Sequence, residues 1–331
     1  MALEKSLPRS FNTYMRPGLI EEYVPLADKN WFKTGGSARF YCAPTTPLEF
    51  QQALAFADTQ SLKICMLGEG ANVLISDEGF DGLVLRPAMQ ELREKPVDGN
   101  HCLVYAGAGV SFQKLIDWCL SNNLVGLEEF SGIPGTVGGS VFINIHYFEH
   151  LLSEFLVEGQ VIHKTTGELL TVPHAWFNFG YNYSTLHENN YYLVSATFKL
   201  KKVDTVQAAY ARGRSDETIR HRHKRYPTIN TCGSFFRNFH ENEVTLISGG
   251  KKLIYVAYYL DKIGVKGELS VGNAGVSYQH ANMIVHTGTT TTQDIVTLAR
   301  TMQELVLQKF GILPQPECRL IGFKNYPLLQ L

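Results

Sequence analysis

Three glycine-rich loops in the first half of the chain constrain its fold more than any other feature. They read GEGANVLISD (68–77), GAGVS (107–111) and SGIPGTVGGSV (131–141). Glycine permits a positive φ and lets backbone N–H groups approach an anion, which is how protein loops cradle phosphates. One such loop is more often a simple turn. Three of them within about 75 residues favour a dinucleotide, because a dinucleotide needs several backbone contacts at once.

The usual nucleotide fingerprints fit these loops poorly. GEGANV has Val73 where the third glycine of G-x-G-x-x-G belongs, and it runs into an apolar strand. GAGVSF lies between a strand and a helix but has Phe112 at that position. Glu128 or Glu129 lies about where a Rossmann domain binds the ribose, so a nicotinamide-binding Rossmann domain remains a weaker alternative. The P-loop pattern and G-x-S-x-G are both absent from the sequence.

The remaining pattern interleaves short strands with helices. Strands are expected at 62–67, 82–87, 101–107 and 190–200, with a hairpin over 155–172 that turns at Thr166–Gly167. Helices are expected from a Ser111 cap to about 122, at 205–225, at 251–264 with Gly264 as its end, and from a Thr291–Asp294 capping box to Gly311. No long regular βαβ period is present, so the fold class is α+β.

Composition excludes several classes of function. A formal net charge of −1 over 331 residues gives no general reason to expect nucleic acid or an anionic membrane as a partner. No apolar run approaches the roughly 20 residues that span a bilayer, and the N-terminus lacks a secretory pattern. Six scattered cysteines without a C-x-x-C pair are typical of reduced, mostly buried thiols in a cytosolic protein.

Single residues give weaker signals. His221 and His223 lack further metal ligands at set spacings, so they indicate an exposed basic helix end and no metal site is expected. The basic run 220–225 lies just upstream of Ser234 and could serve an anionic substrate, although a solvated surface is the default. Taken alone, Ser234 in TCGSFFRNF would be a spacer and Glu317 in PQPECRL a surface residue.

Eight segments, in order, nevertheless resemble one family. They are FKTGGSARF, GEGANVLISDEGFDGLVL, GAGVSFQKLIDWCL, GLEEFSGIPGTVGGSVFIN, FGYNYS, CGSFFRN, GVKGELSVGNAGVSYQHANMIV and FGILPQPECRLIG. Together they are similar to the UDP-N-acetylenolpyruvoylglucosamine reductases, or UDP-N-acetylmuramate dehydrogenases, the flavoenzymes of bacterial peptidoglycan synthesis. The resemblance runs from about residue 22 to 323 and matches the shorter of the family's two types, because no long insertion follows CGSFF.

The resemblance implies an α+β architecture with a two-part FAD-binding unit of the vanillyl-alcohol-oxidase type and a smaller α/β substrate-binding domain. The implied limits are an arm at 1–20, an FAD-binding domain at 21–205 (parts 21–67 and 68–205), a substrate-binding domain at 206–311 and a return to the FAD-binding domain at 312–331.

The resemblance also implies two cofactors, FAD and NADPH, and a UDP-sugar nucleotide as substrate. No nucleic-acid or membrane partner is expected, and we expect a cytoplasmic monomer. The residues implied to bind FAD lie in three stretches: Thr34, Gly35, Gly36; Gly68, Glu69, Gly70, Ala71, Asn72, Val73, Leu74; and Ser131, Gly132, Pro134, Gly135, Thr136, Gly138, Gly139.

In the family, NADPH reduces FAD, and the enolpyruvyl group then takes a hydride and a proton. Ser234 matches the family's proton donor, and Glu317 matches the glutamate that assists at the enol carboxylate. Tyr181, Arg237 and Asn238 match substrate-binding positions, with arginine in place of a more usual lysine.

Two departures from the family pattern bear on activity. Asn182 stands where the family has an arginine that stabilises the enolate, and losing that charge could cost on the order of 10²–10³ in rate. The segment FINIHYFEH (142–150) replaces a run of small residues, and Phe239 replaces a proline. Two alternatives therefore stay open: a flavoprotein of the same fold with another substrate, or a weakly active or degenerate paralogue.

Overall fold

The computed structural model describes residues 15–330, which form two compact units. Unit 1 comprises the described residues up to Tyr23 together with Arg39–Glu69 and Asp81–Arg220. Unit 2 comprises Val24–Ala38, Gly70–Phe80 and the residues from His221 onward. The chain therefore passes from one unit to the other several times. Most of the predicted N-terminal arm lies outside the described residues.

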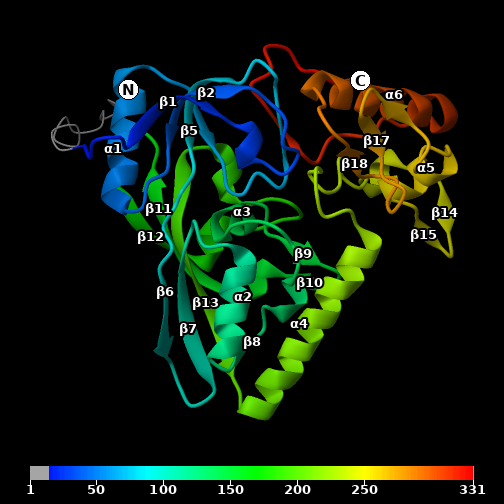
Figure 1. The fold of residues 1–331 in the computed structure, drawn as a ribbon. Helices are drawn as coiled ribbons and strands as arrows, with labels where there is room; N and C mark the ends of the chain where they lie inside the picture. The colour runs from blue at the N-terminus through cyan, green and yellow to red at the C-terminus, as the bar shows by residue number, and fades with distance from the viewer. Residues whose placement is uncertain (1–14, 331) are drawn as a thin grey trace. The chain divides into compact units, whose positions relative to one another are not determined.

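Unit 1 contains a large antiparallel sheet in the order β12-β11-β13-β7-β6, with β8 also paired to β13 (Figure 1). Its strands are β6 (Leu92–Pro96), β7 (His101–Gly107), β8 (Leu124–Val125), β11 (Leu156–His163), β12 (Leu169–Pro173) and β13 (Tyr191–Lys202). The central strand β13 is buried over most of its length, which fits a strand covered on both faces. Since β7 pairs antiparallel with both neighbours, the Rossmann alternative built on GAGVS is wrong.

The rest of unit 1 lies around this sheet and a second one. A four-stranded sheet has the order β1-β2-β5-β3. The remaining strands are β1 (Ile20–Pro25), β2 (Ser37–Cys42), β3 (Ile64–Met66), β5 (Phe80–Leu85), β9 (His146–Tyr147) and β10 (His150–Leu151). Residues 24–25 of β1, 37–38 of β2 and 80 of β5 belong to unit 2. The helices are α1 (Pro47–Thr59), α2 (Phe112–Ser121), α3 (Val137–Phe142) and α4 (Thr205–Arg225), whose last five residues belong to unit 2.

Unit 2 contains two helices and several short strands (Figure 1). Its strands are β4 (Val73–Ile75), β14 (Ile247–Ser248), β15 (Lys251–Lys252), β16 (Ser270–Val271), β17 (Ala274–Val276), β18 (Ile284–His286) and β19 (Arg319–Ile321). β4 and β19 pair in parallel, and β16-β17-β18 form an antiparallel sheet. α6 (Thr292–Phe310) packs on β16 and β17, and α5 (Val256–Lys262) packs on α6.

Short 3₁₀ turns connect these elements. They are Ala27–Lys29, Glu128–Phe130, Leu152–Glu154, His174–Phe177, Thr185–Glu188 and Glu241–Glu243. All six cysteines are free and buried, as predicted. Within residues 15–330, no helix combines the length and apolar character needed to cross a bilayer.

Helix ends follow their local chemistry. The predicted capping box of α6 is confirmed, because Thr291 and Asp294 bond reciprocally, and Gly311 ends the helix at φ +70°. The predicted helix over 251–264 is wrong in its first turn. Gly249 and Gly250 both have positive φ and turn a β14–β15 hairpin instead, so α5 begins at Val256.

Two glycines in unit 2 allow backbone segments to cross without a side chain between them. A Cβ on Gly36 would collide with the carbonyl oxygen of Asp77, and one on Gly322 with that of Gly79. Gly322 also has φ +80°, a conformation that favours glycine. The glycines at these two positions are therefore explained by close backbone packing.

Candidate functional site

The backbone around Ser234 is held from both sides within unit 2. Ser234 forms a β-bridge with Met283, and Phe236 forms one with Pro316. Asn282, which is 3% exposed, accepts a hydrogen bond from the Phe236 N–H (3.0 Å) and donates one to the Phe236 carbonyl (2.7 Å). Because both sides are bonded, the position of the half-buried Ser234 is set by its neighbours.

The small and bulky residues around Ser234 have separate roles. Gly233 has φ +78°, so it turns the chain immediately before the serine. Phe235 and Phe236 are fully buried and pack edge to face with ring centroids 5.0 Å apart. The glycine gives the turn and the two rings anchor it, which explains the unusual TCGSFFRN pattern.

Glu317 lies beside this segment. Its backbone N–H donates to the carbonyl of Phe235, the residue after Ser234, at 2.8 Å. Burial raises the pKa of Glu317 to about 7. At neutral pH, the carboxyl group is therefore protonated in a large fraction of the molecules. The structure therefore brings the predicted proton donor and the predicted assisting acid to neighbouring backbone positions.

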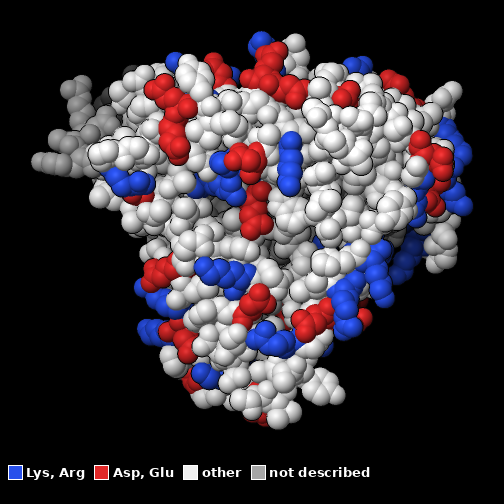
Figure 2. Space-filling model, in the orientation of Figure 1, with Lys and Arg blue, Asp and Glu red and all other residues white. Residues whose placement is uncertain are grey.

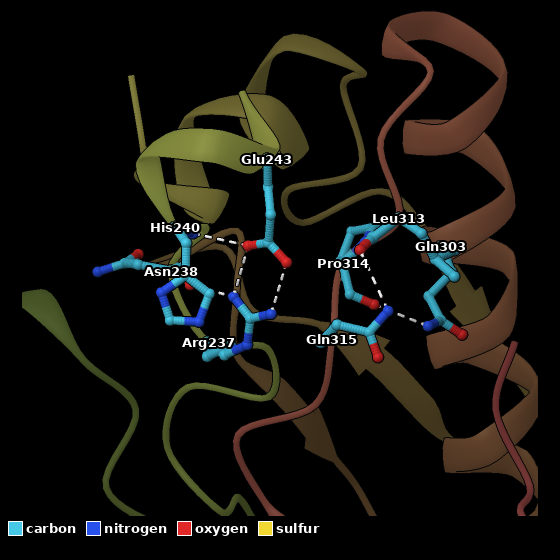
Figure 3. A network of polar contacts seen from close by, with 8 residues as sticks. All are labelled: Arg237, Asn238, His240, Glu243, Gln303, Leu313, Pro314 and Gln315. Carbon is cyan, nitrogen blue, oxygen red and sulfur yellow. Dashed lines mark hydrogen bonds and ion pairs between the residues drawn. The ribbon is translucent and has the colours of Figure 1, made fainter. Parts of the chain in front are cut away.

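The approach of the chain to Glu317 is also fixed. Gln303 of α6 is fully buried, and its side-chain amide donates to the Pro314 carbonyl at 2.8 Å (Figure 3). The N–H of Arg237 donates to the Gln315 carbonyl at 2.9 Å. These bonds tie the segment 313–317 to α6 on one side and to the Ser234 segment on the other.

Arg237 and Asn238 make internal contacts (Figure 3). The two terminal nitrogens of Arg237 bind the two oxygens of Glu243 at 2.8 and 2.7 Å. Arg237 therefore lowers the pKa of Glu243 to about 2. Asn238 Oδ1 accepts from the N–H of Val256 at the start of α5, at 3.3 Å. The structure thus gives both residues a structural partner, and their contact with a diphosphate stays a prediction.

The stretch Thr34–Gly36 belongs to unit 2, as does Gly70–Leu74. Thr34 is 4% exposed, and its hydroxyl has no hydrogen-bond partner among the described residues. A buried hydroxyl in that state is costly unless water or a bound group satisfies it. The Asn72 side-chain amide lies 3.5 Å from the Glu317 carbonyl, and the N–H of Arg319 donates to the Asn72 carbonyl at 3.0 Å. These features fit a cofactor bound at this part of unit 2.

In unit 1, the loop 131–139 is bonded to the loop 107–111. The N–H of Val137 donates to the Val110 carbonyl and that of Gly138 to the Ala108 carbonyl, at 2.8 and 2.9 Å. Thr136 caps α3 by accepting from the N–H of Gly139 at 3.2 Å. Two of the three glycine-rich loops thus form one structure.

A carboxyl group already lies on this structure. Glu69 accepts hydrogen bonds from the N–H of Gly135 and from the hydroxyl of Ser111, and burial raises the pKa of Glu69. Ser111 therefore stands at the predicted N-cap of α2 but bonds elsewhere with its side chain. An acidic oxygen on the Gly135 N–H shows that the loop can hold such a group, and this fits the phosphates of FAD.

The segment 142–150 contacts the two residues that precede Asn182 in unit 1. The Asn144 side-chain amide donates to the Gly180 carbonyl at 3.2 Å, and the rings of His146 and Tyr181 lie 5.0 Å apart. Asn182 sits in the tight turn after them with φ +52°, a conformation that asparagine tolerates better than most residues. Burial lowers the pKa of His146, so its imidazole is neutral at neutral pH and does not replace the missing charge.

Two family models match the chain. One, described as the C-terminal domain of UDP-N-acetylenolpyruvoylglucosamine reductase, matches residues 224–321. The other, described as an FAD binding domain, matches residues 38–173. The α+β fold class with an FAD-binding domain and the prediction of FAD as cofactor are both confirmed.

Similar proteins extend over nearly the whole chain. A UDP-N-acetylenolpyruvoylglucosamine reductase of Synechococcus sp. (strain JA-3-3Ab) is 31% identical over 99% of this chain and 100% of its own. One from Acaryochloris marina is 33% identical over 92% of this chain and 93% of its own. A crystal structure of UDP-N-acetylenolpyruvylglucosamine reductase from Thermus caldophilus matches with a TM-score of 0.72 at 26% identity, covering 93% of this chain and 100% of that one.

Proposed function

Because the chain belongs to the UDP-N-acetylenolpyruvoylglucosamine reductase family, we propose that it reduces UDP-N-acetylglucosamine enolpyruvate to UDP-N-acetylmuramate with NADPH. The family makes it a flavin-dependent oxidoreductase. The reaction supplies a precursor of peptidoglycan. NADPH as the reductant and this sugar nucleotide as the substrate are the parts that we propose.

The observation that carries the proposal is the pairing of Ser234 with Glu317. The Glu317 N–H bonds to the carbonyl next to Ser234, and burial keeps the pKa of Glu317 near 7. A half-buried serine and a carboxyl group of raised pKa, on backbone segments that are bonded to each other, suit a reaction in which negative charge develops and must be neutralised.

Each residue has a stated task in this proposal. FAD, when bound, supplies the hydride that goes to the terminal methylene carbon of the enolpyruvyl group. Charge then develops towards the substrate carboxylate, where the protonated Glu317 Oε–H donates a hydrogen bond. The Ser234 hydroxyl gives its proton to the neighbouring carbon, a transfer that becomes feasible because the acceptor is an enolate.

We propose that the glycine-rich stretches matched by the family resemblance bind FAD. In unit 2 these are Thr34–Gly36 and Gly70–Leu74, supported by the unpartnered Thr34 hydroxyl. In unit 1 they are Gly68, Glu69 and 131–139. These are supported by the Glu69 carboxyl oxygen that accepts a hydrogen bond from the Gly135 N–H. Cytoplasmic location, the monomeric state, and the domain limits near 20, 67, 205 and 311 remain predictions.

The test separates the two half-reactions. Purified protein is reduced anaerobically with NADPH and then mixed with the enolpyruvyl sugar nucleotide, while flavin absorbance is followed. We expect stoichiometric flavin reoxidation and a product heavier by two hydrogens in mass spectrometry. Reduction by NADPH without reoxidation would reject the proposed substrate. Failure of NADPH to reduce the flavin would reject the proposed reductant.

A second function is favoured by one specific observation. Asn182 and the segment 142–150 depart from the family pattern, and the segment contacts Gly180 and Tyr181, which directly precede Asn182. Since both departures lie in neighbouring parts of unit 1, they also fit a flavoprotein of this fold with another substrate, or one with little turnover. The same anaerobic mixing experiment distinguishes the two functions. If the second function is correct, the reduced flavin should persist in the presence of the enolpyruvyl sugar nucleotide.

A further inference from the structure

The first sixteen residues of α4 pack on unit 1 through a narrow face. Within unit 1, the buried residues of α4 are Ala208, Ala211 and Ser215, which lie on one stripe of the helix. Figure 2 shows Lys and Arg side chains gathered along the C-terminal part of this helix, at the right of the view. So small an apolar stripe gives weak hydrophobic docking, and the polar contacts of the helix therefore have more influence.

Two neighbouring residues of α4, Arg214 and Ser215, make polar contacts with one short segment. Ser215 is 2% exposed and shares a 2.7 Å hydrogen bond with the hydroxyl of Ser131, which is fully buried. Arg214 donates to Glu128 through one terminal nitrogen and to Glu129 through the other, the latter at 3.0 Å. Two consecutive residues of α4 thus hold three of the four residues from 128 to 131.

The ion pair meets a need of the buried Glu128. This side chain is 3% exposed, and its second oxygen accepts from the N–H of Gly126 at 2.6 Å. A buried carboxylate is strongly destabilising without a partner of opposite charge. Arg214 supplies that charge from a half-exposed side chain, so the segment gains its stability from α4.

Ser131 is also where the glycine-rich loop 131–139 begins. The next residue, Gly132, donates its N–H to Gln113 of α2 at 2.8 Å. Gly132 and Gly135, which precede α3, give the first part of the loop conformational freedom to lose when it binds a ligand. A loop that is already held at its start loses less of that freedom on binding.

We propose that Arg214 and Ser215 are positioning residues for the cofactor: from α4, they hold residues 128–131 so that the following loop is set to receive FAD. The inference rests on the proposed placement of FAD at loop 131–139. Neither residue touches the loop's glycines or is proposed to contact the cofactor. They act through Glu128, Glu129 and Ser131.

The test measures FAD binding to protein stripped of flavin. Ser215→Ala removes one hydroxyl from the buried stripe without adding volume, and Arg214→Ala removes the ion pair. Arg214→Lys keeps a positive charge without the two-pronged geometry. Arg212→Ala is the matched control, because Arg212 also lies on α4 and donates to Ser121 at 3.1 Å, outside the segment 128–131.

We expect Ser215→Ala and Arg214→Ala to raise the Kd for FAD about 3- to 10-fold, as expected for one hydrogen bond or more. Amide hydrogen exchange over 132–139 should become faster in the flavin-free protein. Arg214→Lys should recover part of the affinity, and Arg212→Ala should match the original protein in both measurements.

Several results would overturn the inference. FAD affinity equal to that of the original protein in both variants would do so, as would faster exchange of the loop with unchanged affinity. An equal loss in Arg212→Ala would show that general docking of α4 is responsible. If Arg214→Ala does not fold, Ser215→Ala decides alone. If the original protein binds FAD but cannot reoxidise it with the sugar nucleotide, the proposed function fails while this inference stands.

Discussion

At the scale of single residues, the candidate site uses two groups that hold protons for different reasons. The hydroxyl of Ser234 has a high intrinsic pKa and gives up its proton only to a strong base such as an enolate. Glu317 keeps its proton near neutral pH because burial raises the pKa of its carboxyl group to about 7. The two groups can therefore be tested separately, by removing the hydroxyl of Ser234 or the titratable carboxyl group of Glu317.

Replacing Ser234 by alanine should separate the half-reactions. Reduction of the flavin by NADPH should be unchanged, because no proton goes to the substrate in that step. Reoxidation by the sugar nucleotide should slow by about 10²–10⁴-fold, the usual value of a positioned proton donor. Stopped-flow absorbance measures both rates. Ser270→Ala, at an exposed serine of the same unit, is the control, and equal slowing of both half-reactions would contradict the donor role.

Glu317 predicts a pH dependence of the second half-reaction. Its carboxyl group is active when protonated, so the reoxidation rate should be constant below about pH 6 and fall as pH rises through about 7. Glu317→Gln cannot titrate and should remove this step from the profile of single-turnover rates. Persistence of the same step in Glu317→Gln would assign it to another group.

The same residue predicts how stability changes with pH. The folded-state pKa of Glu317 is raised, so ionisation of this carboxyl group opposes folding. Its contribution is most favourable below the unfolded-state pKa of about 4.3, worsens as pH rises, and levels off above about 7. Denaturant unfolding at several pH values should show Glu317→Gln gaining on the original protein between these limits. A constant difference would refute the raised pKa.

Asn182 tests whether the missing charge limits the rate. Asn182→Arg should speed flavin reoxidation by about tenfold or more if a cation is lacking at the enolate. Arginine at φ +52° should also cost about 1–2 kcal/mol in stability. Asn189→Arg is a matched control, because Asn189 has φ +58° and lies at the exposed end of a 3₁₀ turn. Slower reoxidation in Asn182→Arg alone would instead indicate a site adapted to asparagine.

At the scale of elements, the ends of helices decide how well the sequence could be interpreted. The boundaries of α6 follow from a threonine cap and a glycine stop, both of which act within a few residues. The start of α5 was missed because two consecutive glycines compete with an apolar helical pattern and form a hairpin instead. Local sequence patterns therefore predict a helix boundary poorly where a turn signal and a helical pattern overlap.

One helix cap could not have been found in this way. The carboxylate of Asp77, in the loop after β4, accepts from the N–H groups of Thr292 and Gln293 at 2.9 and 3.1 Å. Asp77→Ala should lower the free energy of unfolding of unit 2 by about 1–2 kcal/mol, because two N–H groups lose their acceptor. Hydrogen exchange at the first turn of α6 measures this loss. Glu304→Ala, at an exposed position in the middle of α6, should have little effect.

The site itself was predictable in part. Ser234 and Glu317 were found through resemblance, since each alone looks like a spacer or a surface residue, and the structure brings them together. The clamp by Asn282 and the ion pairs of Arg214 depend on contacts between distant parts of the chain. Propensity and spacing contain no information about such contacts, so only the folded structure shows them.

At the scale of the whole molecule, unit 2 is assembled from three separate stretches of the chain. Phe32 and Leu74, from the first two stretches, are fully buried in its core beside residues of the third. Truncating a buried side chain of this size typically costs about 2–5 kcal/mol, which is large against a usual total of about 5–15 kcal/mol. The third stretch alone therefore lacks an essential part of its core.

A fragment of residues 221–331 should consequently fail to fold by itself. Circular dichroism during urea titration should show no cooperative transition for this fragment, and a chain of residues 1–220 added in trans should restore one. A sharp unfolding transition of the isolated fragment would show that the two early segments are dispensable. The same fragment would in that case retain a native-like exchange pattern in α6.

The parallel pairing of β4 with β19 also has a consequence for synthesis of the protein. Val73 leaves the ribosome early, whereas its partner Arg319 lies close to the C-terminus. At 5 to 20 residues per second, roughly 10 to 50 s pass between the synthesis of β4 and that of β19. During this time the three buried, apolar residues of β4 have no native strand beside them. The nascent chain is therefore most exposed to misfolding, and most dependent on chaperones, until translation is almost complete.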